Sequence, residues 1–283
     1  MKIGGIEGGG TKFICAIGNE FGMILKEIVI PTTTPEETLD QAINFFKNNH
    51  IDKLGIACFG PLNININSNN YGCILDTPKK GWSNFNLVKY LKNNLNIPIV
   101  INTDVNAAAL AEIKVGNSKN LTDILYITIG TGIGVGGISN GKIVNGICHS
   151  EMGHIYLNKH PNDSYLGCCP FHNNCLEGLA SGKAIENRYK NNGENLQDND
   201  EVWDLIGFYI GQALASLTFI FSPQRIIIGG GVIKQEKLLP IIKNYFIKFN
   251  NNYINNEYIK DIDSYIQITS LNDRAGLIGS LLL

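Results

Sequence analysis

The chain contains one local pattern twice: an apolar run, a glycine-rich loop and a second apolar run. The first copy spans 2–18 around the loop 8–12, and a further apolar run, 23–30, follows a turn. The second copy spans 124–139 around the loop 130–134, again with a turn and a short run behind it. Short apolar runs bounded by glycine and asparagine turns are typical of strands joined as hairpins. The repeat therefore predicts two similar halves, each opening with an antiparallel meander.

Helices and strands are expected to alternate after each meander, because apolar segments are separated there by turn residues. In the first half we expect helices at 35–50, 85–94 and 104–115, and strands at 54–59 and 99–102. In the second half we expect helices at 176–190, 201–221 and 236–250, and strands at 225–228 and 265–269. A last apolar helix, 274–283, is expected to return to the first half. The sequence thus predicts an α/β protein with two domains, 1–115 plus 271–283 and 116–270.

Composition excludes several classes of protein. The 283 residues are 44% hydrophobic and 17% charged, which fits a soluble globular protein, and the net charge of −2 offers no basic field for nucleic acid. The N-terminus lacks the features of a signal peptide, so we expect a cytoplasmic protein. The longest apolar stretch, 205–221, is interrupted by Gln212, Ser216 and Thr218, which favours a buried helix over a membrane span.

A compact metal-binding pattern lies in the second half. Cys169, His172 and Cys175 stand at three-residue spacing, and His154 lies upstream. Two thiolates and two imidazoles suit a tetrahedral zinc site, and such a closed set leaves no position for a catalytic water, so we expect a structural ion. Cys168 is the spare cysteine, since adjacent cysteines rarely both bind one ion. The alternative interpretation is a polar loop that happens to contain cysteines.

Three glycine-rich loops are candidates for phosphate contacts, because glycine lets backbone amides approach phosphate oxygens. The spacing at 132–137 matches the dinucleotide pattern, but strand residues follow it, which argues against a Rossmann site. The loop 8–12 reverses the P-loop order and also precedes a strand. A third loop, 229–231, follows an apolar strand and is expected to open a helix. Each loop alone favours a structural turn, whereas three at corresponding places favour a nucleotide site.

Taken together, these patterns resemble the ROK family of sugar kinases, of the actin-like ATPase fold, and most of all its fructokinase branch. The motifs that carry the resemblance are at 4–12, 76–82, 103–108, 151–154 and 175–182. The resemblance implies two actin-like (ribonuclease-H-like) domains with a cleft between them that closes on a hexose, ATP-dependent phosphorylation of its hydroxyl, and a homodimer. Fructose and its 6-hydroxyl are expected first, with glucose, mannose and N-acetylmannosamine as alternatives.

The resemblance also implies roles for individual residues. Asp104 is the expected general base, and the alternative is a carboxylate that caps the helix after it. The expected sugar-binding residues are Gly60, Thr103, Glu151, His154 and Glu177. The expected ATP-binding residues are Gly9, Gly10, Thr11, Lys12, Gly130, Thr131, Gly132, Gly229, Gly230 and Gly231. If zinc binds one nitrogen of His154, the other nitrogen can face a sugar hydroxyl.

Two positions depart from the wider family. Glu7 stands where many members have Asp, so a role for it at the Mg²⁺ that bridges the β- and γ-phosphates stays open. Thr103 replaces the Asn that precedes the base in related sugar kinases, which weakens a glucokinase assignment. A sugar-binding transcriptional regulator would need a helix-turn-helix before the first glycine loop, where we expect no room for it. A non-sugar ATP hydrolase on the same fold, or a scaffold protein, stays open as another class.

Overall fold

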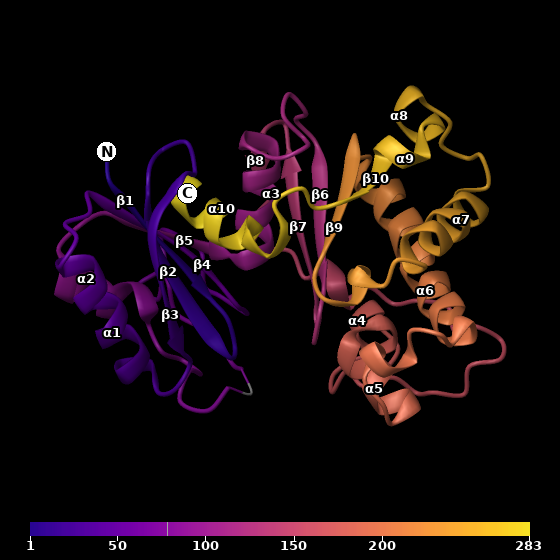
Figure 1. Cartoon of the computed structure of the whole chain (residues 1–283), viewed down its shortest axis with the longest axis horizontal. Coiled ribbons are helices and arrows are strands. Elements are labelled where there is room, and N and C mark those ends of the chain that lie inside the picture. Colours follow the sequence, from indigo (N-terminus) through magenta and orange to yellow (C-terminus); the bar gives the residue numbers. More distant parts are fainter. Residues whose placement is uncertain (78) are drawn as a thin grey trace. The chain divides into compact units, whose positions relative to one another are not determined.

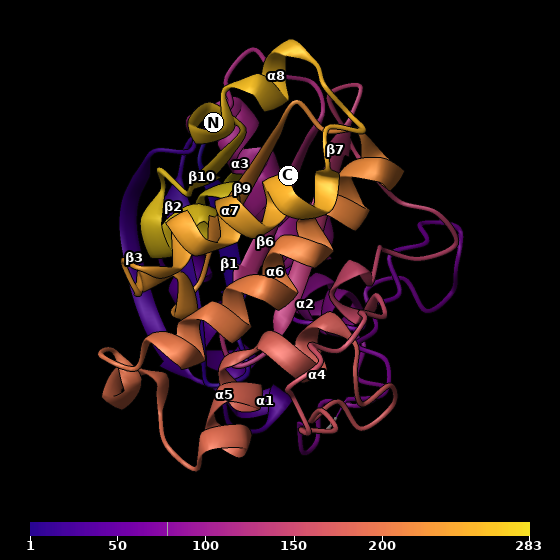
Figure 2. The same ribbon diagram turned by 90° about the vertical axis from the view of Figure 1, so that its right-hand side faces the viewer.

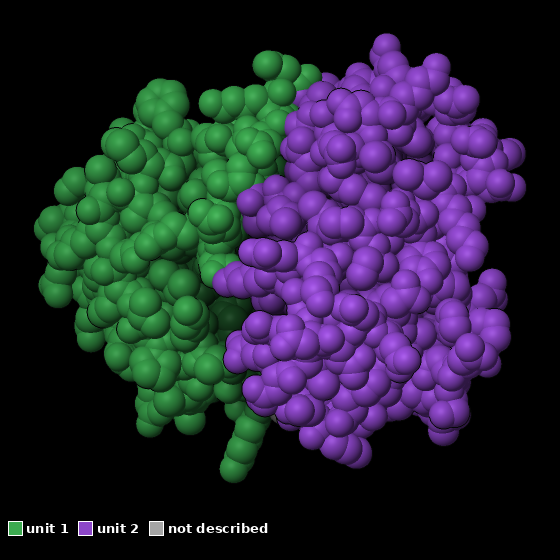
Figure 3. Space-filling view, turned by 45° about the vertical axis from the view of Figure 1, so that its right-hand side comes forward, with its two compact units in different colours: residues 1–120, 136–150, 270–283 green, residues 121–135, 151–269 purple. Residues whose placement is uncertain are grey.

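The computed structural model describes residues 1–77 and 79–283, so Pro78, one residue of the 76–82 motif, lies outside the described residues. Two five-stranded sheets with flanking helices make up the described part of the chain (Figure 1). The chain folds into two compact units, which Figure 3 colours separately. Unit 1 comprises Met1–Asn120, Gly136–Ser150 and Ser270–Leu283, and unit 2 comprises Leu121–Val135 and Glu151–Thr269.

The division into domains 1–115 plus 271–283 and 116–270 stays a prediction. The compact units put residues 116–120 and 270 in unit 1 as well, and they differ from the predicted division most over one longer segment. The segment Gly136–Ser150 belongs to unit 1, although it lies in the second half of the sequence. The boundary between the units falls inside one strand, between Val135 and Gly136. Hydrophobic periodicity could not predict it, because the apolar pattern continues through the strand.

The sheet of unit 1 has the strand order β3-β2-β1-β4-β5. Its strands are β1 (Ile3–Gly8), β2 (Lys12–Gly18), β3 (Ile24–Pro31), β4 (Lys53–Cys58) and β5 (Ile99–Thr103). β1, β2 and β3 pair antiparallel, which confirms the predicted meander, and β4 and β5 add to β1 in parallel. Parallel neighbours need crossover connections, and helices supply them here.

Helices cover both faces of this sheet. They are α1 (Pro35–Lys47), α2 (Leu87–Leu95), α3 (Asp104–Lys114) and α10 (Ala275–Leu282), and Figure 1 shows α1 and α2 on one face and α10 on the other. Side chains alternate along a strand, so a Cβ at Gly4 would meet Phe46 of α1, whereas one at Gly5 would overlap Ser280 of α10. The predicted return of the last helix to the first half is confirmed.

The second sheet repeats this layout. It comprises β6 (Ile124–Ile129), β7 (Ile133–Ser139), β8 (Lys142–Ile143), β9 (Arg225–Gly229) and β10 (Ile266–Ile268). Its order β8-β7-β6-β9-β10 corresponds strand for strand to β3-β2-β1-β4-β5, and β9 pairs in parallel with both β6 and β10. The predicted duplication of the pattern is therefore confirmed.

The helices of unit 2 begin with a break that the sequence pattern did not predict. The structure has α4 (Leu176–Ala180), α5 (Gly182–Tyr189), α6 (Asp200–Phe221), α7 (Leu238–Asn250), α8 (Glu257–Lys260) and α9 (Ile262–Tyr265). The helix expected at 176–190 is divided because Ser181 has extended backbone angles (φ −70°, ψ 164°) and caps α5, its Oγ accepting the Ala184 amide at 3.2 Å. The loop 229–231 opens only a short 3-10 helix, Val232–Lys234, and α7 begins after it at Leu238.

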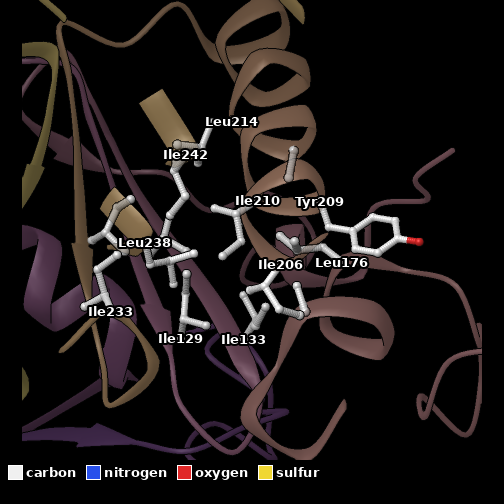
Figure 4. Close-up of a cluster of buried hydrophobic side chains, with 14 of the residues drawn as sticks. Ile129, Ile133, Leu176, Ile206, Tyr209, Ile210, Leu214, Ile233, Leu238 and Ile242 are labelled. Carbon is white, nitrogen blue, oxygen red and sulfur yellow. The ribbon is translucent and has the colours of Figure 1, made fainter. Parts of the chain in front are cut away.

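A single apolar core fills unit 2 between its sheet and helices. α6 and α7 run side by side (Figure 2), and side chains of both meet Ile129, Ile133 and Ile233 (Figure 4). Among the described helices, α6 is long and apolar enough to cross a membrane, but 61% of its most apolar window is buried in this core. Each fully buried aliphatic side chain contributes about 1.5–3 kcal/mol. The apolar character of α6 is therefore explained by its place in the core.

Candidate active site and metal centre

The first glycine loop, residues 8–12, joins β1 to β2 with an open backbone. The Gly9 amide donates to the Lys12 carbonyl at 3.0 Å, and Lys79 Nζ donates to the Gly10 carbonyl at 2.5 Å. A Cβ at Gly10 would meet nothing within 4 Å, and Thr11 and Lys12 are exposed. An exposed loop with two nearby ammonium groups suits an anion. Lys79 was not among the predicted site residues, although it lies within the 76–82 motif.

Glu7 at the end of β1 is in an unusual environment. Its Oε2 is buried and has no hydrogen-bond partner among the described residues. Burial, followed by the charge of Asp104, raises the pKa of Glu7 to about 7, against the opposing charge of Lys12. A Cβ at Gly276 of α10 would overlap Oε1 of Glu7, so this glycine makes room for the longer side chain. An unpartnered carboxylate oxygen beside a second carboxylate fits a hard divalent cation such as Mg²⁺.

Asp104 is the first residue of α3. The helix cap is Thr103, which is buried with extended angles and whose Oγ1 accepts the Asn106 amide at 3.2 Å. The Asp104 Oδ1 accepts the Val105 amide at 2.9 Å. The alternative in which Asp104 caps α3 is therefore wrong, because Thr103 performs that role. The carboxylate of Asp104 lies where β5 ends and α3 starts, and it is only partly buried.

The turn at Gly60 is supported by a histidine from a distant part of the sequence. His149 is buried, and its Nε2 accepts the Leu62 amide at 2.9 Å. A Cβ at Gly60 would lie 3.4 Å from Cε1 of His149, so the imidazole packs directly against the turn. His149 was not predicted to have a role, because no local spacing connects it with Gly60.

The second glycine loop, residues 130–134, is attached to the segment after the metal-binding cysteines. The Gly130 carbonyl accepts the Gly182 amide at 2.7 Å, and the Thr131 carbonyl accepts the Lys183 amide at 3.4 Å. The Glu177 Oε2 accepts the Ile133 amide at 3.0 Å. Two of the predicted functional groups, this loop and Glu177, are thus in direct contact.

Two glycines of the third loop, residues 229–231, differ in their surroundings: the backbone conformation requires glycine at 230, whereas the space beside Gly231 is open. Gly230 has φ of 93°, and a Cβ there would overlap the Ile129 backbone. A Cβ at Gly231 would meet nothing within 4 Å. Gly230 is therefore explained by structure alone, and the open Gly231 is the better candidate for a ligand contact.

The four predicted metal donors lie together in unit 2. One donor atom from each of His154, Cys169, His172 and Cys175 lies within 4.8 Å of all the others. Cys169 Sγ is 3.7 Å from His154 Nδ1 and 3.6 Å from His172 Nδ1, and Cys175 Sγ is 3.5 Å from His154 Nδ1. Tetrahedral zinc with Zn–S of about 2.3 Å and Zn–N of about 2.0 Å would separate sulfur from nitrogen by about 3.5 Å. The donor set therefore fits zinc.

The surroundings of the donors are consistent with a structural ion. Burial raises the pKa of Cys175 to about 12, so its thiol is protonated until a cation displaces the proton. Cys175 also caps α4, its Sγ accepting the Gly178 amide at 3.4 Å. Cys168 Sγ lies 4.0 Å from the Ser181 hydroxyl and is not one of the four clustered donors.

Glu151 and His154 are two further predicted sugar ligands, and His154 is also one of the four donors. Glu151 is exposed and immediately precedes the 3-10 turn Met152–His154. A Cβ at Gly153 would overlap the Ile133 carbonyl, so the glycine allows this turn to pack on the second glycine loop. Since Nδ1 of His154 faces both thiols, Nε2 is the nitrogen left for other ligands. Gly153, next to His154, and Glu177 both meet the backbone of Ile133.

Comparisons with known proteins agree over the full length. The sequence model of the ROK family matches residues 3–283. The fructokinase of Pediococcus pentosaceus is 43% identical over 283 residues, which are 100% of this chain and 97% of that protein. The solved structure of ROK hexokinase from Thermus thermophilus has a TM-score of 0.81 at 24% identity, covering 100% of this chain and 97% of that one.

A second solved structure is a ROK family glucokinase from Streptomyces griseus in complex with glucose and AMPPNP. Its TM-score is 0.76 at 25% identity, and the match covers 99% of this chain and 98% of that one. These likenesses and the duplicated sheets show the actin-like ATPase fold predicted from the sequence.

Proposed function

The chain belongs to the ROK family, and we propose that it is an ATP-dependent fructokinase that phosphorylates the 6-hydroxyl of D-fructose. The observation that carries the proposal is the Asp104 carboxylate, partly exposed at the first residue of α3, in a chain similar over its whole length to a protein named fructokinase. Glucokinase, mannokinase and N-acetylmannosamine kinase activities are the alternatives within the same family.

Asp104 takes the proton of the 6-hydroxyl in the proposed reaction. The hydroxyl oxygen then attacks the γ-phosphorus of ATP, the bond to the β–γ bridging oxygen breaks, and ADP leaves. General-base catalysis of this kind contributes about 10²–10⁴-fold to the rate. Thr103 fixes the start of α3, so the base is presented from a capped helix and not from a mobile loop.

The phosphate groups are assigned to the glycine loops and to Lys12. Gly9, Gly10, Thr11 and the ammonium of Lys12 are assigned to the phosphates, as are Gly130, Thr131 and Gly132. The Gly9 and Gly130 amides already donate within their loops, so neighbouring amides would be the donors. Gly229, Gly230 and Gly231 are assigned to the rest of the nucleotide. Glu7 would hold Mg²⁺, which neutralises charge on the transferred phosphoryl group when bound.

The sugar is assigned to directional polar groups. These are Glu151, Glu177 and the Nε2 of His154, together with the Gly60 turn and Thr103. The Thr103 Oγ1 already accepts the Asn106 amide, so its O–H hydrogen and its second lone pair are left for a sugar. Zinc at His154, Cys169, His172 and Cys175 would fix the direction of the His154 ring.

The remaining assignments are coarser. We propose a homodimer, as the family resemblance implies, and a cytoplasmic location, because the proposed reaction consumes ATP. The partners are then a hexose and ATP, without nucleic acid or membrane.

ADP production by the zinc-loaded protein with Mg-ATP tests the proposal. The panel is fructose, mannose, glucose, N-acetylmannosamine and no sugar, compared by kcat/KM. Fructose is expected to give the highest value. A higher kcat/KM for another hexose would make that hexose the assigned substrate, and the assignment as a sugar kinase would stand. ADP formation that is independent of sugar, or absent, would sink the kinase assignment and favour a hydrolase or a binding protein.

A further inference from the structure

We propose that Glu177 is a positioning residue that holds the second glycine loop, residues 130–134, in its nucleotide-binding form and links it to the metal centre. The inference rests on the proposed function, because it assumes that this loop contacts ATP. It gives Glu177 a second role, beside its assignment to the sugar, and it makes nucleotide affinity depend on a residue of the metal-binding segment.

The first support is the contact between Glu177 and the loop. The Ile133 amide donates to Oε2 of Glu177 at 3.0 Å, across 44 residues of sequence. A Cβ at Gly132 would lie 2.5 Å from the same oxygen, so the carboxylate occupies the space in which another residue would place its side chain. The contact with Glu177 is therefore enough to require glycine at position 132, whether or not a ligand also approaches there.

The second support is the nature of the loop. Glycines at 130, 132 and 134 raise the conformational entropy that must be lost when the loop is ordered. Three hydrogen bonds between the loop and residues 177–183 oppose this disorder: the Gly182 and Lys183 amides donate to loop carbonyls, and the Ile133 amide donates to Glu177. The first two join backbone to backbone, so Glu177 supplies the one side-chain contact of the three, and mutation can remove it.

The third support is the position of Glu177 relative to the metal donors. Glu177 is the second residue of α4, and the cap of α4 is Cys175, whose Sγ accepts the Gly178 amide. Cys175 is also one of the four clustered donors. A change at the metal therefore acts on the start of the helix that carries Glu177, and through Oε2 on the glycine loop.

The test separates this role from sugar binding by omitting the sugar. Affinity for AMPPNP is measured by calorimetry for the wild type, Glu177→Ala and Glu177→Gln, with the exposed Glu186→Ala of α5 as matched control. Losing a hydrogen bond to a charged group should weaken AMPPNP binding by Glu177→Ala about tenfold. The amide oxygen of Gln still accepts from Ile133, so Glu177→Gln and Glu186→Ala should bind AMPPNP at least as tightly as the wild type.

Hydrogen exchange gives a readout that needs neither substrate nor activity. Exchange in a peptide covering 130–134 should be faster in Glu177→Ala and in metal-stripped wild type, and unchanged in Glu177→Gln. A double-mutant cycle adds a further check. Gly132→Ala should raise exchange when Glu177 is present, because the added methyl group meets the carboxylate. The same change should have a smaller effect in Glu177→Ala, where the carboxylate is gone.

The outcomes distinguish this inference from the proposed function. Suppose that the wild type phosphorylates fructose and that, without sugar, Glu177→Ala binds AMPPNP as tightly as the wild type does. The positioning role is then wrong and the kinase assignment stands. Unchanged exchange at 130–134 in Glu177→Ala would also overturn the positioning role. Weaker AMPPNP binding in Glu177→Ala alone, with no fructose turnover by the wild type, would support the positioning role and contradict the choice of substrate.

Discussion

The Nε2 of His149 accepts the backbone amide of Leu62 at 2.9 Å, although the two residues are 87 positions apart. This contact joins the end of the segment Gly136–Ser150 to the turn that contains Gly60, within unit 1. Because the donor is a buried backbone amide, it must find a partner or lose stability. His149 therefore supports the proposed sugar-binding turn.

Replacing His149 should affect the sugar more than the nucleotide. His149→Ala leaves the Leu62 amide unsatisfied, which costs about 1–3 kcal/mol of unfolding free energy, and loosens the turn at Gly60. We expect a several-fold rise in KM for fructose with KM for ATP unchanged, measured by steady-state kinetics with each substrate varied. The matched control is His50→Asn, since His50 is exposed and has a positive φ that Asn tolerates. Equal rises in both KM values would refute the assignment of His149 to the sugar side.

Removal of the proposed base should abolish turnover. Asp104→Asn keeps the size of the side chain and the acceptor for the Val105 amide, but cannot take a proton at neutral pH. We expect kcat to fall by about 10²–10⁴-fold, with fructose affinity by calorimetry nearly unchanged. Asp200→Asn, at an exposed position of α6, is the control. A variant that keeps a tenth of the wild-type kcat would contradict the role of Asp104.

Local elements of this fold could be predicted because their signals are contained in short windows. The meander β1–β3 and the helix α3 follow from apolar periodicity and turn residues close in sequence. The break at Ser181 was missed because the apolar pattern runs through 176–190, whereas the break depends on one serine side chain capping α5.

Contacts between distant residues could not be predicted in the same way. The pairs His149–Leu62 and Glu177–Ile133 join a side chain to a backbone amide, and no residue type at the amide position marks the contact. The room for Glu7 likewise depends on Gly276, which lies at the other end of the chain. Such relationships arise from the packing of strands and helices, which sequence spacing alone does not describe.

The two adjacent cysteines should behave differently toward zinc. Cys169→Ser removes a clustered donor and should lower bound zinc to well below one ion per chain. The zinc content of the purified protein is measured by inductively coupled plasma mass spectrometry. If the lost site costs about 2–3 kcal/mol, Tm should fall by about 5–10 °C. Cys168→Ser is the control in the same loop and should keep both zinc and Tm. Full zinc content in Cys169→Ser, or its loss in Cys168→Ser, would show that the ligands are wrongly chosen.

The buried carboxyl of Glu7 should make stability depend on pH in a defined window. Its pKa is about 7 in the folded chain and 4.5 ordinarily, so the folded state holds the proton more tightly than the unfolded state. This contribution to stability is fully present below pH 4.5 and is lost as pH rises to about 7. The difference in pKa corresponds to about 3 kcal/mol.

Glu7→Gln removes this titration and so isolates it. Without Mg²⁺, the unfolding free energy of Glu7→Gln minus that of the wild type should increase by about 3 kcal/mol between pH 4.5 and 7.5, by urea titration. Other titrating groups are common to both proteins and cancel in the difference. Mg-ATP should reduce the difference at pH 7.5, because a cation at Glu7 stabilises the ionised form in the wild type.

The exposed Glu194→Gln should show no trend with pH. A flat difference for Glu7→Gln as well would mean that Glu7 ionises freely in the folded chain, and its assignment to a cation at the end of β1 would lose its physical basis.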